Sequence, residues 1–444
     1  MKKTISLLLV FVILSVGFLS FEASAANYNP DFEITAQGAY MVNLDTDTLI
    51  YEKNAHKKLY PASLTKLMTC LLLVENVPDL DNTTITAKAA ILGTFSTMNV
   101  SLAGILAGEV LTARELLYCM LLQSGNEAAA IVADYLGDQS INNFIDMMNA
   151  RAKQLGAVNT NFVNPHGLHD ENHYTTAYDM YLIAKECLKH DEIIEIASTY
   201  SYKLRKTNKR DGEWLVSTNK MMLKSSDYYR SYIKGLKTGT TTPAGKCFVS
   251  YAENKGYHYL TVLLGSKYKD EKGNVVANNY AFSETGALCD WAFNKFSLKT
   301  LLPTDKSCAQ VELRLSSERD TLLLYPKDKV VAIIPDEIDP SSVQIKTYVD
   351  TYAKAPIKKG DICGYVEVKL ADEVVGTTDL ISSEDVERSD LLYIGQIVKD
   401  VFNSIWIKLA VVLLILFALV YVILIIRQEV NSQRYRSIIK KRRF

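Results

Sequence analysis

The sequence lacks the cysteine patterns typical of small folds that are stabilised by disulfides or by a metal ion. Its 444 residues include seven cysteines, an odd number, and no two of them form a Cys-x-x-Cys pair. This pattern indicates neither a zinc site nor a complete disulfide framework. Net charge is also close to zero, at −1, and the 26 tyrosines are scattered along the chain. The composition therefore gives no sign of a nucleic-acid surface.

An apolar run near the N-terminus predicts a processing segment. Two lysines at positions 2 and 3 precede the run from Ile5 to Phe21, and Ala23-Ser24-Ala25 follows it as a small-residue cleavage site. This order is typical of a signal peptide, which we place at residues 1–25, with an uncleaved anchor as the alternative. The sequence thus predicts export to the outside of the cytoplasmic membrane.

A second apolar run lies near the C-terminus. The stretch from Leu409 to Ile426 carries no charged residue, so we predict a transmembrane helix at 405–426, with a buried core helix as the alternative. Apolar residues at helical spacing before it predict an amphipathic juxtamembrane helix at 390–404. Arg and Lys dominate residues 427–444, and this bias predicts a cytoplasmic tail.

The segment from Tyr60 to Thr69 places a hydroxyl and an amine on the same predicted helix. Apolar residues recur at helical spacing after Ser63, and Pro61 is favoured where a helix begins. Ser63 and Lys66, three residues apart, therefore share a face near the positive end of the helix dipole. A buried lysine can activate a serine if its pKa falls to near 7, which costs roughly 4 to 5 kcal/mol. Alone, the pattern more often marks a structural serine and a lysine whose stem packs on the core.

A short connection between two helices carries Ser124 and Asn126. Thr112 and Glu115 form a capping box that opens a helix through Leu122, and a second helix is predicted from Glu127. A loop held between buried helices can present its side chains to a cleft. An ordinary helix–turn–helix corner is the alternative, because Ser, Gly and Asn are common turn residues.

The remaining segments predict an α+β domain at 30–300. Two hairpins and the strand Gly235–Thr240, placed at a sheet edge, surround a helical block, which argues for an antiparallel sheet flanked by helices. Short alternating segments then predict a small all-β domain at 305–388. His166, His169 and His173 cluster in a loop, where we favour hydrogen bonding over a metal site.

Ser63-x-x-Lys66, Ser124-x-Asn126 and Lys237-Thr238-Gly239 occur in that order, a triple signature of serine β-lactamases and penicillin-binding proteins. With these motifs the chain resembles the low-molecular-weight penicillin-binding proteins of the D-alanyl-D-alanine carboxypeptidase family. The resemblance implies the penicillin-binding, serine β-lactamase-like transpeptidase fold.

The resemblance also implies roles for the first two motifs. Ser63 would attack the terminal D-Ala–D-Ala bond of peptidoglycan stem peptides and form an acyl-enzyme, with Lys66 as its base. Ser124 would relay a proton to the leaving D-alanine, and Asn126 would fix Lys66 and the substrate amide. β-Lactam antibiotics would acylate the same serine. The family chemistry implies no metal and no cofactor.

The strand motif would bind the substrate. Lys237 would supply positive potential, Thr238 would bind the terminal carboxylate, and Gly239 would lie between them and the oxyanion hole. The backbone N–H groups of Ser63 and Thr240 would form that hole, each donor being worth about 3 kcal/mol.

Two departures from the family pattern keep alternatives open. Position 125 is Gly, which fits the carboxypeptidase branch, but no arginine occurs between Arg230 and Arg314 to bind the substrate carboxylate. Lysine at 267, 269 or 272 could take that place, without the bidentate fork of arginine. We therefore expect a membrane-anchored carboxypeptidase, single-pass with its catalytic domain outside the cell. The alternatives are a non-catalytic muropeptide-binding or sensing protein and a β-lactamase.

Overall fold

The computed structural model describes residues 29–370 and 373–441, and the chain divides into two compact units. The first unit is the chain up to Leu301 together with Val331–Gln344 and Lys369–Gly376. The second is Leu302–Val330, Ile345–Val368 and Thr377–Phe444. The predicted signal peptide at 1–25 lies outside the described residues, as do the last three positions of the predicted tail.

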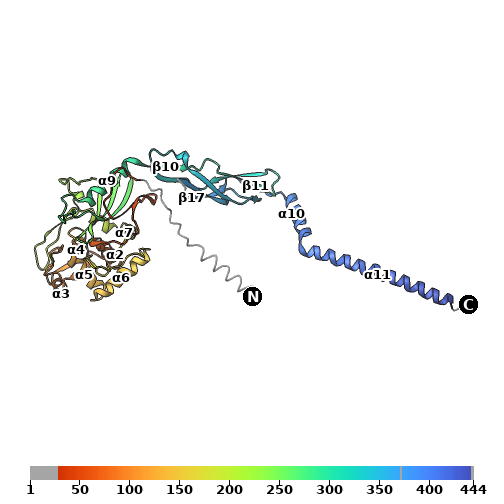
Figure 1. The fold of residues 1–444 in the computed structure, drawn as a ribbon, viewed down its shortest axis with the longest axis horizontal. Coiled ribbons are helices and arrows are strands. Elements are labelled where there is room, and N and C mark those ends of the chain that lie inside the picture. The colour runs from red at the N-terminus through yellow and green to blue at the C-terminus, as the bar shows by residue number, and fades with distance from the viewer. Residues whose placement is uncertain (1–28, 371–372, 442–444) are drawn as a thin grey trace. The chain divides into compact units, whose positions relative to one another are not determined.

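An antiparallel five-stranded sheet forms the centre of the first unit (Figure 1). The strand order β2-β1-β9-β8-β7 places β7 at one edge, as predicted. Lys255 and Gly256 form the β8–β9 turn, both at positive φ, as a two-residue hairpin turn requires. The strands are β1 (Gly38–Asn43), β2 (Thr48–Lys53), β7 (Ile233–Thr241), β8 (Gly245–Asn254) and β9 (Tyr257–Ser266).

Helices cover both faces of this sheet, because successive strand residues send their apolar side chains into two different cores (Figure 1). Val249 and Val262 enter the core of the helical block, whereas Phe248 and Leu263 enter the core beneath α9 (Tyr280–Lys295). The helices of the block are α2 (Lys66–Asn76), α4 (Ala113–Leu121), α5 (Asn126–Leu136), α6 (Ile141–Gln154), α7 (Ala177–Cys187) and α8 (Asp191–Ala197).

Short elements connect the block to the sheet and fix its loops. The predicted capping box is confirmed: Thr112 Oγ1 accepts from the Glu115 N–H at 3.1 Å, and Glu115 Oε2 accepts from the Thr112 N–H at 2.8 Å. The short elements are η1 (Ala62–Thr65), β3 (Thr84–Thr86), α3 (Ala89–Gly93), β4 (Val110–Thr112), β5 (Ser201–Lys203), β6 (Trp214–Val216) and η2 (Lys220–Met222).

The second unit is built on a six-stranded sheet in the order β14-β16-β17-β12-β11-β15. Val311, Leu322, Leu324 and Val366 are among its buried residues. The strands are β11 (Ala309–Arg314), β12 (Thr321–Pro326), β14 (Gln344–Val349), β15 (Tyr352–Lys354), β16 (Ile362–Leu370) and β17 (Glu373–Ser382). Strands β10 (Phe296–Leu302) and β13 (Val330–Pro335) pair with each other in a separate two-stranded sheet, and the short η3 (Pro340–Ser342) follows.

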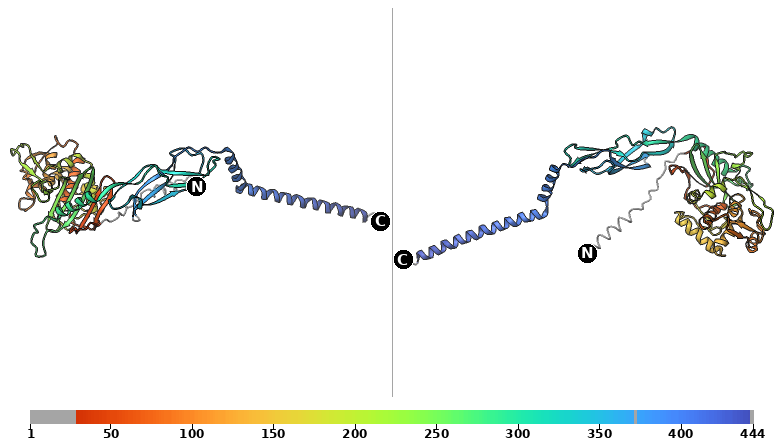
Figure 2. Two further views of the ribbon diagram at one scale, coloured as in Figure 1. Left: turned by 90° about the horizontal axis from the view of Figure 1, so that it is seen from above. Right: turned by 180° about the vertical axis from the view of Figure 1, so that it is seen from behind.

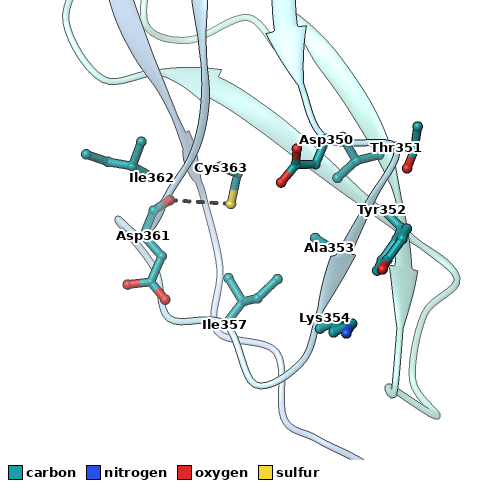
Figure 3. Close-up of a pocket in the computed structure, with 10 residues that line it drawn as sticks. Asp350, Thr351, Tyr352, Ala353, Lys354, Ile357, Asp361, Ile362 and Cys363 are labelled. Atoms are coloured by element: carbon teal, nitrogen blue, oxygen red, sulfur yellow. Dashed lines mark hydrogen bonds between the residues drawn. The ribbon is translucent and has the colours of Figure 1, made fainter. Parts of the chain in front are cut away.

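A pocket of about 560 Å³ lies in the second unit, beside β15 and β16 (Figure 3). Tyr352 and Lys354 line it from β15, and Asp361 lies across from them. The Cys363 thiol contacts the Asp361 backbone oxygen at 3.6 Å. The pocket is open and holds no nucleophile paired with a base, so we assign it no chemistry.

Two helices end the described chain, α10 (Asp390–Asn403) and α11 (Ile405–Lys441) (Figure 2). The apolar residues of α10, such as Leu391 and Phe402, are exposed, as expected of an amphipathic helix. The helix α11 is continuous, and its Ile405–Gln433 part is long and apolar enough to cross a membrane.

Candidate active site

Ser63 lies in the 3₁₀ turn η1, which leads directly into α2 at Lys66. Pro61 caps this turn, as its fixed φ allows. Ala62 has a φ of +48°, a conformation that costs energy for a residue with a Cβ and is often found beside functional groups. The neighbours of Ser63 are buried while Ser63 itself is partly exposed, so Ser63 is the residue of this turn that solvent or a substrate can reach.

The Lys66 amine has three close partners, although its side chain is fully buried. Its Nζ is 3.1 Å from Ser63 Oγ, 2.7 Å from Asn126 Oδ1 and 2.7 Å from the His166 backbone oxygen. The two carbonyl-type oxygens can only accept hydrogen bonds, whereas the serine hydroxyl can donate or accept. A neutral amine would thus use its two N–H groups on the carbonyls and turn its lone pair toward Ser63.

Two buried lysines, Lys66 and Lys237, share this site, and within the described part of the chain neither is hydrogen-bonded to a carboxylate. Burial is the main cause that lowers the pKa of Lys66 well below its usual value, and the nearby Lys237 charge lowers it further. Burial likewise lowers the pKa of Lys237 to about 7. Lys237 Nζ donates to the Thr238 backbone oxygen at 3.1 Å. The site therefore favours at least one neutral amine near pH 7.

Two glycines let other segments approach the serine turn closely. A Cβ on Gly239 would lie 3.0 Å from the Pro61 oxygen and 3.2 Å from the Ser63 nitrogen. Only glycine therefore lets β7 pass so near η1 without displacement. A Cβ on Gly167, which has a φ of +84°, would meet the Ala62 oxygen at 1.8 Å. The loop that carries His166 is thus pressed onto the same turn.

The loop between α4 and α5 supplies Ser124, and Asn126 is the first residue of α5. Ser124 has a φ of +60°, and Asn126 donates its backbone N–H and its Nδ2 to the Ser101 oxygen, each at 3.0 Å. These bonds leave Asn126 Oδ1 free to accept from Lys66. No hydrogen bond joins Ser124 to Lys66 or Lys237 in the described part of the chain. The Lys66 amine is therefore hydrogen-bonded to both Ser63 and Asn126. Ser124 precedes Asn126 by two residues in the chain.

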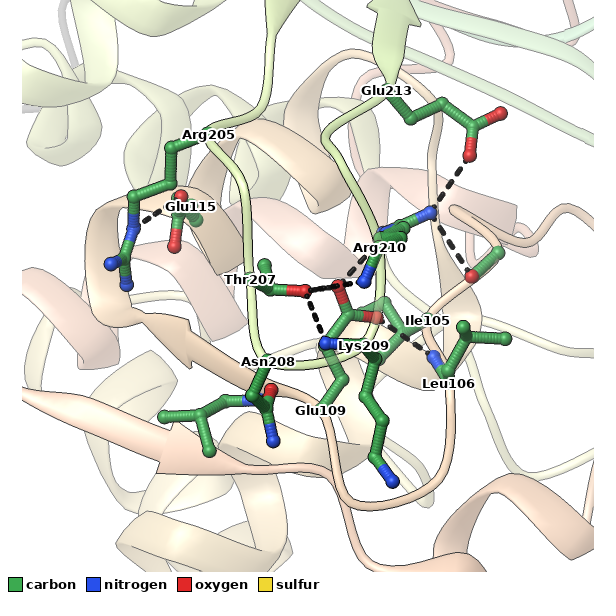
Figure 4. Close-up of polar contacts among 12 residues, drawn as sticks. Ile105, Leu106, Glu109, Glu115, Arg205, Thr207, Asn208, Lys209, Arg210 and Glu213 are labelled. Carbon is green, nitrogen blue, oxygen red and sulfur yellow. Dashed lines mark hydrogen bonds and ion pairs between the residues drawn. The ribbon is translucent and has the colours of Figure 1, made fainter.

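Buried carboxylates hold the segment that carries Ser101. Glu127 Oε1 accepts from the Ala103 N–H at 2.5 Å. Glu109, fully buried, accepts from the Leu106 N–H at 2.9 Å and from Arg210 Nε at 2.8 Å (Figure 4). These bonds fix the backbone at Ala103 and Leu106, close along the chain to Ser101, whose oxygen accepts from Asn126.

A nearby contact involves the strand motif. Thr218 Oγ1 lies 2.6 Å from Thr238 Oγ1, which places the segment before η2 beside the edge strand β7. Thr240 follows on the same strand and is exposed. The sequence did not predict the contacts made by Thr218 or by the His166 carbonyl, because no motif marks either residue.

The three loop histidines make contacts of a structural kind. His173 Nε2 lies 2.7 Å from Thr65 Oγ1, and its Nδ1 accepts from the Val163 N–H at 3.1 Å. The His169 ring stands edge-on to Tyr60. Among the described residues no group of His, Cys, Asp and Glu is arranged to hold a metal ion.

Comparisons with known proteins agree with this geometry. Residues 22–268 match the family described as D-alanyl-D-alanine carboxypeptidase, and 296–388 match the C-terminal domain of penicillin-binding protein 5. The chain is 28% identical over 393 residues to the D-alanyl-D-alanine carboxypeptidase DacF of Bacillus subtilis, covering 88% of this chain and 96% of that protein.

Two further likenesses extend over most of the chain. Identity to DacC of Escherichia coli is 27% over 365 residues, with 80% of this chain and 85% of that protein covered. The crystal structure of DacD from Francisella tularensis superposes with a TM-score of 0.64 at 20% identity, covering 84% of this chain and all of the other. The latter likeness supports the fold.

Proposed function

The chain belongs to the D-alanyl-D-alanine carboxypeptidase family, and on that premise we propose that its serine cleft removes the terminal D-alanine from peptidoglycan stem peptides. The observation that supports the assignment best is the contact of the fully buried Lys66 amine with Ser63 Oγ at 3.1 Å. A serine is a poor nucleophile without such a base.

In the proposed acylation, neutral Lys66 accepts the Ser63 proton while Oγ attacks the carbonyl carbon of the scissile bond. The Asn126 and His166 oxygens hold the amine in place and stabilise the ammonium that forms. Ser124 then relays a proton to the nitrogen of the leaving D-alanine. The bond from carbonyl carbon to nitrogen breaks, and the acyl group stays on Ser63.

The oxyanion forms where β7 approaches the serine turn. The N–H groups of Ser63 and Thr240 would donate to it, and the close approach at Gly239 supports this placement. Each such donor is worth about 3 kcal/mol in the transition state. Lys237 and Thr238 would attract and orient the terminal carboxylate. Water then cleaves the ester and restores Ser63, without a metal or cofactor.

Penicillin is proposed to acylate the same serine. A β-lactam presents a carbonyl and a carboxylate at a spacing like that of D-Ala–D-Ala, so it fits the same groups. Rapid release of the penicilloyl ester would need another base aimed at the deacylating water. Glu127, the carboxylate whose charge acts on Lys66, has its Oε1 bonded to the Ala103 N–H, and no described contact joins it to Ser63. We therefore expect a long-lived adduct and not β-lactamase turnover.

The C-terminal helix is proposed to anchor the enzyme as a single-pass membrane protein. Its apolar Ile405–Gln433 part is long enough to cross the bilayer, and α10 has exposed apolar residues suited to the interface. The predicted signal peptide and the basic residues after Ile426 orient the chain with the catalytic unit outside and the tail in the cytoplasm.

The direct test incubates the detergent-solubilised full chain with a pentapeptide ending in D-Ala–D-Ala and quantifies free D-alanine. Release by the wild type and its loss in Ser63→Ala supports the proposal. The matched control is Ser341→Ala, which changes an exposed serine of η3. Absence of D-alanine release by the folded wild type would overturn the assignment.

A further inference from the structure

Two consecutive residues at the start of α5 hold the same loop. Asn126 donates its backbone N–H and its Nδ2 to the Ser101 oxygen, each at 3.0 Å. Glu127 Oε1 accepts from the Ala103 N–H at 2.5 Å, two residues further along that loop. The Asn126 amide also bonds to Lys66 through its Oδ1, at 2.7 Å. The position of this loop therefore fixes the orientation of an amide that contacts the Lys66 amine.

The loop fits tightly against the carboxylate of Glu127. A Cβ on Gly125 would lie 3.0 Å from the Ala103 Cβ and 3.2 Å from Glu127 Oε2, so glycine is the residue that leaves room here. The Ile105 N–H lies 3.5 Å from Glu127 Oε1 as a further, longer contact. A change at Glu127 that removed its oxygens would therefore loosen the loop that Asn126 binds.

Glu127 differs from two other buried carboxylates of the first unit because it has no arginine partner. Glu109 pairs with Arg210 at 2.8 Å and Glu115 with Arg205 at 2.9 Å (Figure 4). Among the described residues, Glu127 is buried, makes no ion pair, and has an Oε2 without a hydrogen-bond partner. Its charge is therefore not cancelled by an adjacent cation and acts on groups further away.

Several ionisable groups face the Lys66 amine. They are Lys237 on β7, Cys70 on α2, Glu127 on α5, and His166 and His173 in the loop before α7. Burial lowers the pKa of His166 to about 3 and that of His173 to about 4, and it raises the pKa of Cys70 to about 12. These three groups are therefore neutral near pH 7. Glu127 remains as the described acid whose charge opposes that of Lys237 at Lys66.

We propose that Glu127 is a positioning residue for acylation, which orients the Asn126 amide through the loop and stabilises the Lys66 ammonium by its charge. The inference rests on the proposed function. In the step concerned, the proton moves from Ser63 Oγ to Lys66 Nζ, and Glu127 stays ionised throughout. A fixed negative charge in a buried site favours the positive charge that forms on the amine.

The experiment measures the second-order rate of benzylpenicillin acylation of the full chain between about pH 6 and pH 10, where Lys66 must be neutral to act. Glu127→Gln keeps an oxygen for the Ala103 N–H and removes the charge. Its rate should rise at a pH lower by up to about one unit, because the ammonium form of Lys66 loses its counter-charge. The plateau should fall about threefold to tenfold, because a weaker base accepts the proton less readily.

Two variants separate the charge from the packing. Glu127→Asp restores the charge and should return the pH profile toward that of the wild type. Glu127→Ala also frees the Ala103 N–H, so it should show the shift of the Gln variant with a lower plateau. The matched control is Glu115→Gln, which neutralises a buried carboxylate already balanced by Arg205 and should leave the profile in place.

The outcomes are distinguishable. Thermal unfolding of each variant checks that it is folded at the assay temperature. A Glu127→Gln profile that superimposes on that of the wild type would overturn the inference alone. So would a loss of rate that is equal at every pH and equal in the Gln and Asp variants, because that is the mark of packing without a charge effect. Absence of acylation in the folded wild type would overturn the proposed function, and this inference with it.

Discussion

The two compact units differ in how they bury charge. Among the described residues, the first unit buries eight acidic or basic side chains (Asp, Glu, Lys or His), whereas the buried polar side chains of the second are those of Ser316 and Ser382. The eight are Lys66, Glu109, Glu115, Glu127, His173, Asp179, Lys237 and Glu284. Burying a charge is costly unless it is paired or changes its protonation state. The first unit therefore loses free energy of folding by burying these charges, a loss that the second unit avoids. The proposed chemistry explains why the first unit keeps them.

The largest effect expected from this contrast is on acylation. Lys66→Met should slow penicillin acylation of Ser63 by about 10³-fold, because it removes the proposed base without leaving a buried charge. Stopped-flow or timed intact-mass measurements give the rate. The control in the second unit is Lys358→Met, at an exposed lysine, which should acylate as the wild type does. Equal rates in the two variants would remove Lys66 from the mechanism.

The second prediction concerns stability and pH. The folded pKa of Lys237 is about 7, below the unfolded value of about 10.4. Between these values the unfolded chain binds more protons, so the free energy of unfolding should rise with pH by up to about 1.4 kcal/mol per unit. Below pH 7 both states are protonated and the full penalty applies.

Lys237→Met should abolish this part of the slope and be most stabilising, relative to the wild type, at pH 7 or below. Denaturant unfolding of the first unit at pH 7 and pH 9, followed by a probe confined to that unit, measures the difference. A stabilisation by Lys237→Met that is equal at both pH values would show that Lys237 is not perturbed as described.

The third prediction compares carboxylates. Glu109→Ala removes the fully buried partner of Arg210, which keeps its contacts with Glu213 and the Gly104 oxygen, and this loss should cost about 3 kcal/mol. Glu312→Ala removes the partner of Arg314 on the exposed surface of the second unit and should leave the unfolding midpoint unchanged. Thermal unfolding monitored by circular dichroism tests both. A similar small change in the two variants would refute the proposed contrast.

The smallest effect concerns thiol reactivity. The five cysteines of the first unit are buried, while Cys308 and Cys363 of the second are partly exposed. Burial raises the pKa of Cys70, Cys247 and Cys289 to about 12, so their thiolates are scarce as well as inaccessible. Maleimide labelling with peptide mapping should modify Cys308 and Cys363 first. Early labelling of Cys70 would contradict the packing of the lysine pocket.

The sequence predicted the secondary structure around the site well, because the motifs that encode it are local. The capping box at Thr112, the turn at Lys255-Gly256 and the helix after Pro61 each follow from residues a few positions apart, and the structure confirms them. The Ser63–Lys66 contact belongs to the same class, since residues three apart share a helix face.

The remainder of the site depends on contacts that no local pattern encodes. The His166 oxygen that accepts from Lys66 is a backbone atom 100 residues away, and Arg210 meets Glu109 across 101 residues. The Thr218 hydroxyl lies 2.6 Å from that of Thr238 on β7, a contact between two separate segments. Backbone acceptors and cross-strand neighbours carry no residue signature, so they become visible only once the strands are paired.

The account depends most on acylation at one hydroxyl inside the lysine pocket. Incubation of the full chain with benzylpenicillin, followed by intact-mass analysis and peptide mapping, tests this directly. The account predicts one stable adduct, located on Ser63 and absent from Ser63→Ala. An adduct on a different residue, or none on the folded wild-type chain, would contradict it.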